Sequence, residues 1–332
     1  MILAAGLSPA WQQLMLLDSL ELGEVNRARE VHWCASGKVL NVGRALHCLA
    51  GPQLDAEGNC KLKIENCKFQ NGNETGGADV HILAVVGGLT GEAIQREFAD
   101  LEISARWIET KSPTRTCTTL LVPATGTTTE LVENARPIAD DELALFRKAY
   151  DEEARSAEIV VLTGSFPAGT PPTLYRDLLA ATPGRVVLDA QGEPLLAALE
   201  GRPFVVKPNR QELAHTLGRP LATDDQLHAA MREICQRGAT WIVVSQGKGR
   251  VWIASEREML SATPPDVAVV NPIGCGDCLA AGIATALARG EEVLEAVLTG
   301  MAAAADNAGR LLAARLDANR VDELRRNLQL QY

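Results

Sequence analysis

The chain has 332 residues and a formal net charge of −10, with 46% hydrophobic and 22% charged residues. This length is typical of one large α/β domain with a small addition, and the hydrophobic fraction is sufficient for a core. The negative charge argues against general affinity for nucleic acid, because binding its backbone requires patches of lysine and arginine. No apolar run approaches the roughly 20 residues that cross a bilayer, so we expect no membrane partner.

The first residues and the cysteines bear on the cellular compartment. Residues 1–7 lack a basic start and predict a first strand, not a signal peptide. The eight cysteines form no paired framework, which indicates reduced thiols and a cytoplasmic protein. Cys275 and Cys278 have C-x-x-C spacing, but no second pair of ligands accompanies them. We therefore favour two small side chains at a helix start over a metal site.

Short apolar runs alternate with amphipathic helical stretches from about residue 159 onward. The runs are 159–162, 185–189, 204–206 and 241–245, and residues 172–181 are helical in pattern. Continuous apolar strands separated by helices predict a parallel sheet that is buried on both faces. We therefore expect a single α/β domain over 1–332, a doubly wound α/β/α sandwich. Ligands bind such sheets beyond the carboxyl ends of the strands.

Two segments, residues 20–35 and 115–135, alternate polar and apolar positions instead. The second flanks a Pro-Ala-Thr-Gly turn at 123–126, which is typical of a hairpin with one exposed face. We interpret both segments as strands of a small β-sheet that projects as a lid. Residues 51–79 are polar and lack periodicity, so they predict a surface insertion with no assignable chemistry.

The stretch from Val269 to Gly282 carries the clearest chemical pattern. Gly274 and Gly276 allow a tight turn, and an alanine-rich helix is expected from about Gly276 to Ala288. The N–H groups and the dipole of such a helix start attract an anion. Asp277 at that end suits a general base that takes the proton of an attacking hydroxyl beside a bound phosphoryl group. The alternative is that Asp277 only caps the helix.

This glycine turn resembles the G-A-G-D signature of the PfkB (ribokinase-like) carbohydrate kinases, and four more blocks resemble that family in the same order. They are SGKVLNVGRA at 36–45, TGSFPAG at 163–169, VKPNRQEL at 206–213 and VSQG at 244–247. Within the family the chain is most similar to the 1-phosphofructokinase and tagatose-6-phosphate kinase branch. The signs are the residues at 23–26, 207–209 and 129–133.

The resemblance implies an ATP-dependent carbohydrate kinase with an acceptor site and a nucleotide site. Asp277 would be the catalytic base, and the anion hole would use the amides of Gly274, Cys275 and Gly276. The residues implied for acceptor binding are Gln12, Gly37, Lys38, Asn41 and Arg115, with Arg115 as a phosphate clamp. The residues implied for ATP binding are Lys207, Asn209, Glu212, Ser245, Gly247 and, at the adenine, Asn307.

The same resemblance implies Mg²⁺, organised by Asn209 and Glu212 largely through water. Each role has a structural alternative. Glu212 could instead be an acidic residue in the first turn of a helix, where it interacts favourably with the helix dipole. Arg115 could instead be a solvated strand residue, and Lys207 a surface charge.

Three positions depart from the family pattern. Gln12 stands where the family has an aspartate that holds sugar hydroxyls, and Val39 replaces a glycine and adds a Cβ near the expected substrate. Cys275 replaces an alanine, which an anion hole made of backbone amides tolerates. The first two changes lie on the acceptor side.

We therefore expect phosphorylation of a sugar phosphate by MgATP. An unphosphorylated sugar or nucleoside is the alternative acceptor, and a catalytically idle sugar sensor is the alternative function. Exposed edges and an apolar face of the lid also suggest a homodimer through paired lids.

Overall fold

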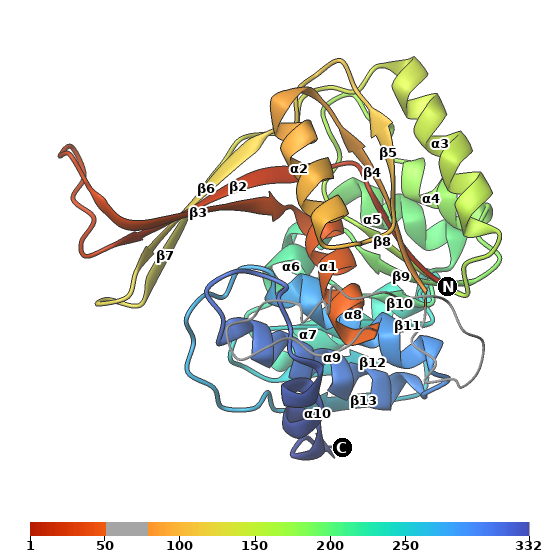
Figure 1. The fold of residues 1–332 in the computed structure, drawn as a ribbon. Helices are drawn as coiled ribbons and strands as arrows, with labels where there is room; N and C mark the ends of the chain where they lie inside the picture. The colour runs from red at the N-terminus through yellow and green to blue at the C-terminus, as the bar shows by residue number, and fades with distance from the viewer. Residues whose placement is uncertain (51–78, 332) are drawn as a thin grey trace, which may run out of the picture.

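The computed structural model describes residues 1–50 and 79–331, which form a layered α/β body and a projecting small sheet (Figure 1). The described residues of the body contain a ten-stranded sheet in the order β14-β13-β12-β11-β10-β9-β8-β1-β4-β5. Its strands are β1 (Ile2–Gly6), β4 (Val80–Val86), β5 (Ala105–Glu109), β8 (Ile159–Thr163), β9 (Arg185–Asp189), β10 (Val205–Val206), β11 (Trp241–Val244), β12 (Val251–Ala254), β13 (Met259–Ala262) and β14 (Leu330–Gln331). The expected insertion at 51–79 lies, apart from Asp79, outside the described residues.

The sheet is parallel from β5 to β11 and antiparallel from β11 to β14. The inner parallel strands are buried on both faces, as their apolar runs predict, whereas most of the edge strand β5 is only partly buried. Successive residues of β1 alternate between two cores: Ile2 and Ala4 belong to one, and Leu3 and Ala5 to the other. The expected doubly wound α/β/α sandwich is therefore confirmed.

Helices cover both faces of the sheet. One face carries α1 (Lys38–Ala50), α2 (Gly88–Asp100), α8 (Cys275–Ala288), α9 (Val293–Ala308) and α10 (Ala318–Arg326). The other carries α3 (Asp140–Ala154), α4 (Leu174–Ala180), α5 (Gly192–Ala198) with a 3-10 turn at Leu199–Gly201, α6 (Arg210–Leu217) and α7 (Asp224–Gln236). Helix α8 begins one residue before the position that the sequence suggested. None of the helices in the described ranges is both long and apolar enough to cross a membrane.

The small sheet has the strand order β3-β2-β6-β7 and extends away from the body (Figure 1). Its strands are β2 (Ala10–Leu17), β3 (Ala28–Ser36), β6 (Thr116–Val122) and β7 (Thr127–Val132). The expected segment 115–135 contains β6 and β7, and the expected segment 20–35 contains most of β3. Residues 20–27 are not strand, however, and β2 was not anticipated.

The position of the central strand β1 indicates where a ligand site is expected. The helix α1, which follows β1 in the crossover to β4, covers one face, whereas α4, which follows β8, covers the other. The winding direction therefore reverses between β1 and β8. In open parallel sheets ligands bind at this switch point, beyond the carboxyl ends of the strands.

Candidate active site

A cavity of about 1480 Å³ lies at this switch point, between the carboxyl ends of the large sheet and one face of the small sheet. This volume exceeds the roughly 300–1,000 Å³ of ordinary small-molecule pockets and suits two substrates side by side. The sequence-predicted site residues that line it are Gln12, Gly37, Lys38, Asn41, Arg115, Lys207, Asn209, Glu212, Ser245, Gly247, Gly274, Cys275, Gly276 and Asp277. Asn307 is not among the lining residues.

The glycine turn before α8 has a backbone that only glycine adopts easily. Gly274 has φ of 83°, and a Cβ there would lie 2.9 Å from the Ala313 Cβ. The N–H of Cys275 donates to the Pro272 carbonyl at 3.3 Å. Within the described part of the chain, the N–H groups of Gly274, Gly276 and Asp277 make no hydrogen bond. The turn therefore presents unpaired amide donors and a helix dipole to the cavity, which suits an anion.

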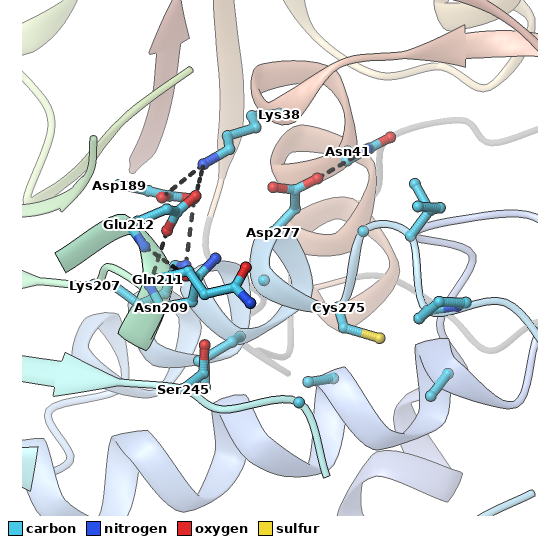
Figure 2. A pocket seen from close by; sticks show the side chains of 18 of the residues that line it. Lys38, Asn41, Asp189, Lys207, Asn209, Gln211, Glu212, Ser245, Cys275 and Asp277 are labelled. Carbon is cyan, nitrogen blue, oxygen red and sulfur yellow. Dashed lines mark hydrogen bonds and ion pairs between the residues drawn. The ribbon is translucent and has the colours of Figure 1, made fainter. Parts of the chain in front are cut away.

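Asp277 is buried in the first turn of α8, and its Oδ2 accepts a hydrogen bond of 2.8 Å from Asn41 Nδ2 (Figure 2). Burial raises the pKa of Asp277 to about 6; the charge of Lys38 and the Asn41 bond oppose the rise, and Asp189 adds to it. A carboxyl group with this pKa is ionised at neutral pH and accepts a proton more readily than an ordinary aspartate.

Two lysines and two carboxylates form a network in the same cavity, close to the glycine turn. Lys38 Nζ lies 3.0 Å from Asp189 Oδ1 and 3.4 Å from Glu212 Oε1 (Figure 2). Lys207 Nζ lies 3.4 Å from Asp189 Oδ2 and is buried, so Lys207 is not a surface charge. A Cβ on Gly276 would meet Lys207 Nζ at 3.4 Å, which places this ammonium directly beside the glycine turn.

The pKa shifts of this network follow from its geometry. Burial alone would lower the pKa of Lys38, but Asp189 and Glu212 outweigh it, so the pKa is raised. Burial alone would raise the pKa of Asp189, but Lys207 and Lys38 outweigh it, so the pKa is lowered. Lys38 and Asp189 therefore stay charged across the neutral range.

Asn209 and Glu212 form a reciprocal capping box at the start of α6. Asn209 Oδ1 accepts from the Glu212 N–H at 2.8 Å, and Glu212 Oε2 accepts from the Asn209 N–H at 2.8 Å. The second Glu212 oxygen contacts Lys38 inside the cavity. Both side chains thus serve the helix cap that the sequence left as an alternative, while Glu212 also presents its carboxylate to the cavity.

On the acceptor side, two predicted residues are held by the protein itself. Gln12 Nε2 donates to Thr119 Oγ1 at 2.8 Å. The Arg115 guanidinium donates to the carbonyls of Ser8, Pro9 and Glu133 at 3.2–3.3 Å. Arg115 is therefore more than a solvated strand residue, because it ties the base of the small sheet together at the cavity wall.

Two residues lie elsewhere than the sequence suggested. Asn307 is fully buried behind the glycine turn; its Nδ2 donates to the Ile273 carbonyl, and its Oδ1 accepts from the Ala314 N–H. It fixes the turn and does not line a nucleotide pocket. Val39 is also buried, in the core beside Gly6, so its Cβ does not face the cavity.

Sequence reasoning missed Asp189, which joins Lys38 to Lys207. The available signal was its place at the end of β9, one of the strand ends where ligands bind. Its two partners are remote in sequence, so the pairing itself follows only from the fold.

The fold closely matches solved structures of small-molecule kinases. A possible 1-phosphofructokinase from Thermotoga maritima superposes with a TM-score of 0.84 at 19% identity, over 99% of this chain and 98% of that one. Phosphofructokinase-2 from Escherichia coli in complex with fructose-6-phosphate gives 0.82 at 24% identity, over 98% of both chains. Ribokinase from Thermotoga maritima gives 0.71 at 18% identity, over 98% and 99%. At these identities the likeness establishes the ribokinase-like fold.

The sequence itself matches a family model. Residues 69–317 match the model of the pfkB family carbohydrate kinases. This match covers most of the chain, and it agrees with a cavity that joins an anion-binding helix start to a buried aspartate. The chain therefore belongs to the pfkB family of carbohydrate kinases and is an ATP-dependent kinase of that class.

Proposed function

We propose that this kinase transfers the γ-phosphoryl group of MgATP to a hydroxyl of a sugar phosphate, with Asp277 as the general base. The observation that carries the proposal is the position of Asp277. It is buried, its pKa is raised to about 6, and it lies beside unpaired backbone N–H groups in the shared cavity.

Different residues of this chain would bind the proton, the phosphoryl group and the phosphate charge. Asn41 holds one oxygen of Asp277 and leaves the other oxygen to accept the hydroxyl proton. The N–H groups of Gly274 and Gly276 would hold the transferring phosphoryl oxygens, and the Cys275 N–H would join them by exchanging its long bond to Pro272. Lys38 and Lys207 supply positive charge near the phosphates. Positioning and electrostatics provide most of the acceleration in such transfers.

Magnesium fits the carboxylate network only through water and phosphate oxygens. In the described ranges, no three His, Cys, Asp or Glu side chains surround a position that could hold a metal ion. Asn209 Oδ1 is taken by the helix cap, which leaves the Glu212 carboxylate facing the cavity. Mg²⁺ keeps several waters and needs few direct protein ligands, so Glu212 would hold a hydrated ion. When bound with ATP, the ion neutralises the charge of the phosphates.

A sugar phosphate is the acceptor that we favour. Lys38 and Arg115 both line the cavity, and two of the similar solved structures are described as a possible 1-phosphofructokinase and a complex with fructose-6-phosphate. Arg115 would exchange some of its carbonyl bonds for phosphate oxygens, to which it binds more strongly. Arg115→Ala should then raise the KM of a phosphorylated acceptor by about tenfold or more, the scale of one lost charge-assisted bond.

An unphosphorylated sugar or nucleoside is the second candidate. The observation that favours it is that Lys38 already faces two carboxylates and Arg115 three carbonyls. For such an acceptor, Arg115→Ala would leave the KM nearly unchanged. A sugar sensor is disfavoured, because a sensor needs no buried base.

The small sheet would act as a lid that excludes water, and its outer face would pair with a second copy. Trp33 and Leu131 on that face are 49% and 56% exposed, and Trp11 stacks on Trp33 with centroids 6.4 Å apart. Apolar side chains gathered on one sheet face favour association. A monomer in sedimentation velocity at micromolar concentration would remove the dimer proposal.

The test of the proposed function is a panel of acceptors, with detection of both ADP and the phosphorylated product. The panel contains fructose 1-phosphate, fructose 6-phosphate, tagatose 6-phosphate, fructose, ribose and adenosine. Asp277→Asn keeps the size of the side chain and an oxygen for Asn41, but it loses the base. We expect at least about a hundredfold loss of kcat on the best acceptor. A near-normal rate would refute the role of Asp277.

A further inference from the structure

The face of the small sheet that borders the cavity carries a charged side chain to which the sequence assigned no role. The strand residues of the small sheet that line the cavity are Ala10, Gln12, Ser36, Cys117, Glu130 and Val132. Glu130 is the charged member of this set. It lies on β7, directly opposite Thr119 on β6.

The strand register explains why Glu130 faces the cavity. Gln12 pairs with Cys117, and Cys117 pairs with Val132, so these three side chains share one face. Thr119 lies two residues from Cys117 on β6, and Glu130 lies two residues from Val132 on β7. Both side chains therefore point to the same face as Gln12. The Thr119 hydroxyl accepts a hydrogen bond from the side-chain amide of Gln12. The Glu130 carboxylate therefore lies on the same face of the sheet as Gln12, one cross-strand pair away.

The Glu130 carboxylate has no partner of its own. Across residues 1–50 and 79–331, no side chain or backbone group donates a hydrogen bond to it or forms an ion pair with it. Glu130 is exposed and lines the cavity; partial burial of its carboxyl group raises the pKa, and the charge of Arg115 only partly opposes the rise. Its two oxygens can therefore accept hydrogen bonds from a ligand in the cavity.

We infer that Glu130 binds two neighbouring hydroxyl groups of the acceptor sugar and fixes which hydroxyl faces Asp277. A carboxylate has two acceptor oxygens, which match the two O–H donors of a vicinal diol. Gln12 cannot supply this charge, although it stands where the family's hydroxyl-binding aspartate is expected. This inference rests on the proposed function, since it assumes that the acceptor occupies this end of the cavity.

The test compares Glu130→Gln with Glu133→Gln. The control removes the same charge three residues away, outside the cavity lining, and its amide oxygen still accepts from the Thr116 N–H that Glu133 holds. For Glu130→Gln we expect the acceptor KM to rise about tenfold to a hundredfold, the scale of lost bonds to a charged group. We expect the KM for ATP to stay within about twofold. The control should change neither KM.

A second measurement separates this inference from the proposed function. Calorimetric titration of the wild type and of both variants with the same sugars and sugar phosphates reports binding even without turnover. Weaker sugar binding by Glu130→Gln alone supports the inference, whatever the outcome for Asp277→Asn. Equal binding by wild type and Glu130→Gln overturns it. So does an equal loss in Glu133→Gln, or the absence of binding by every member of the panel at millimolar concentration.

Discussion

The two ends of the cavity are built in different ways. The phosphoryl-transfer end is made by the start of α8 and by strand ends of the large sheet, and its charged groups Asp189, Lys207 and Asp277 are buried and fixed by one another or by Asn41. The acceptor end is made by the projecting sheet, where Glu130 is exposed and has no hydrogen-bond or ion-pair partner among the described residues. Under the proposed function, the chemistry resides in the buried end of the cavity, whereas acceptor choice resides in a projecting sheet that lies largely outside the two large cores.

The largest expected effect tests the rigidity of the phosphoryl-transfer end. Gly274→Ala places a Cβ 2.9 Å from Ala313 in a backbone with φ of 83°, so the turn must shift. Displacing the amide donors should lower kcat by about a hundredfold to a thousandfold. Gly290→Ala is the matched control, because Gly290 has φ of 82° but an open surrounding. Steady-state kinetics that show equal losses for both variants would mean that the turn has no special role.

The next effect concerns stability. Asp189→Asn leaves the buried Lys207 ammonium without the counter-ion shown here, which should lower the free energy of unfolding by about 3–5 kcal/mol. Asp177→Asn, in a half-exposed ion pair with Arg147, should change it by less than about 1 kcal/mol. Denaturant titration measures both.

The pH dependence of that loss follows from the sign of the shift. The pKa of Asp189 is lowered in the fold, so its contribution is present above the unfolded pKa of about 3.9 and disappears as pH falls. The pKa of Asp277, which Asp189 helps to raise, is about 6, so the difference between wild type and Asp189→Asn should be constant only above it, between pH of about 7 and 9. A difference that grows steadily through this range would contradict the assigned charge state.

The smallest expected effect is at Cys275. Its side chain contacts Asn307, and burial raises the pKa of its thiol, so the thiol is a weak nucleophile. Cys275→Ala, which restores the family's residue, should keep kcat within about twofold, because the proposed hole uses backbone amides. A loss of more than about tenfold in kcat would show that the thiol itself takes part.

Most of the large sheet and the glycine turn were predictable from local patterns. Strands such as 159–163 are continuous apolar runs, and the Asn209–Glu212 spacing is a capping box that can be read directly. The pairing of Asp189 with Lys38 joins residues 151 positions apart, which no local pattern encodes. The sequence analysis singled out Asn307 but could not show on which face of α9 it lies. The position of Glu130 at the cavity follows only from the strand register.

The central claim is that Asp277 is the base of the transfer, and the pH profile of kcat/KM for the acceptor tests it most directly. Because the reactive form is the carboxylate and its pKa is about 6, kcat/KM should fall about tenfold per pH unit below that value and level off above it. Asp277→Asn should lose this acid limb together with most of its rate. A wild-type profile that stays flat to about pH 5, or an acid limb that persists in Asp277→Asn, would contradict the assignment.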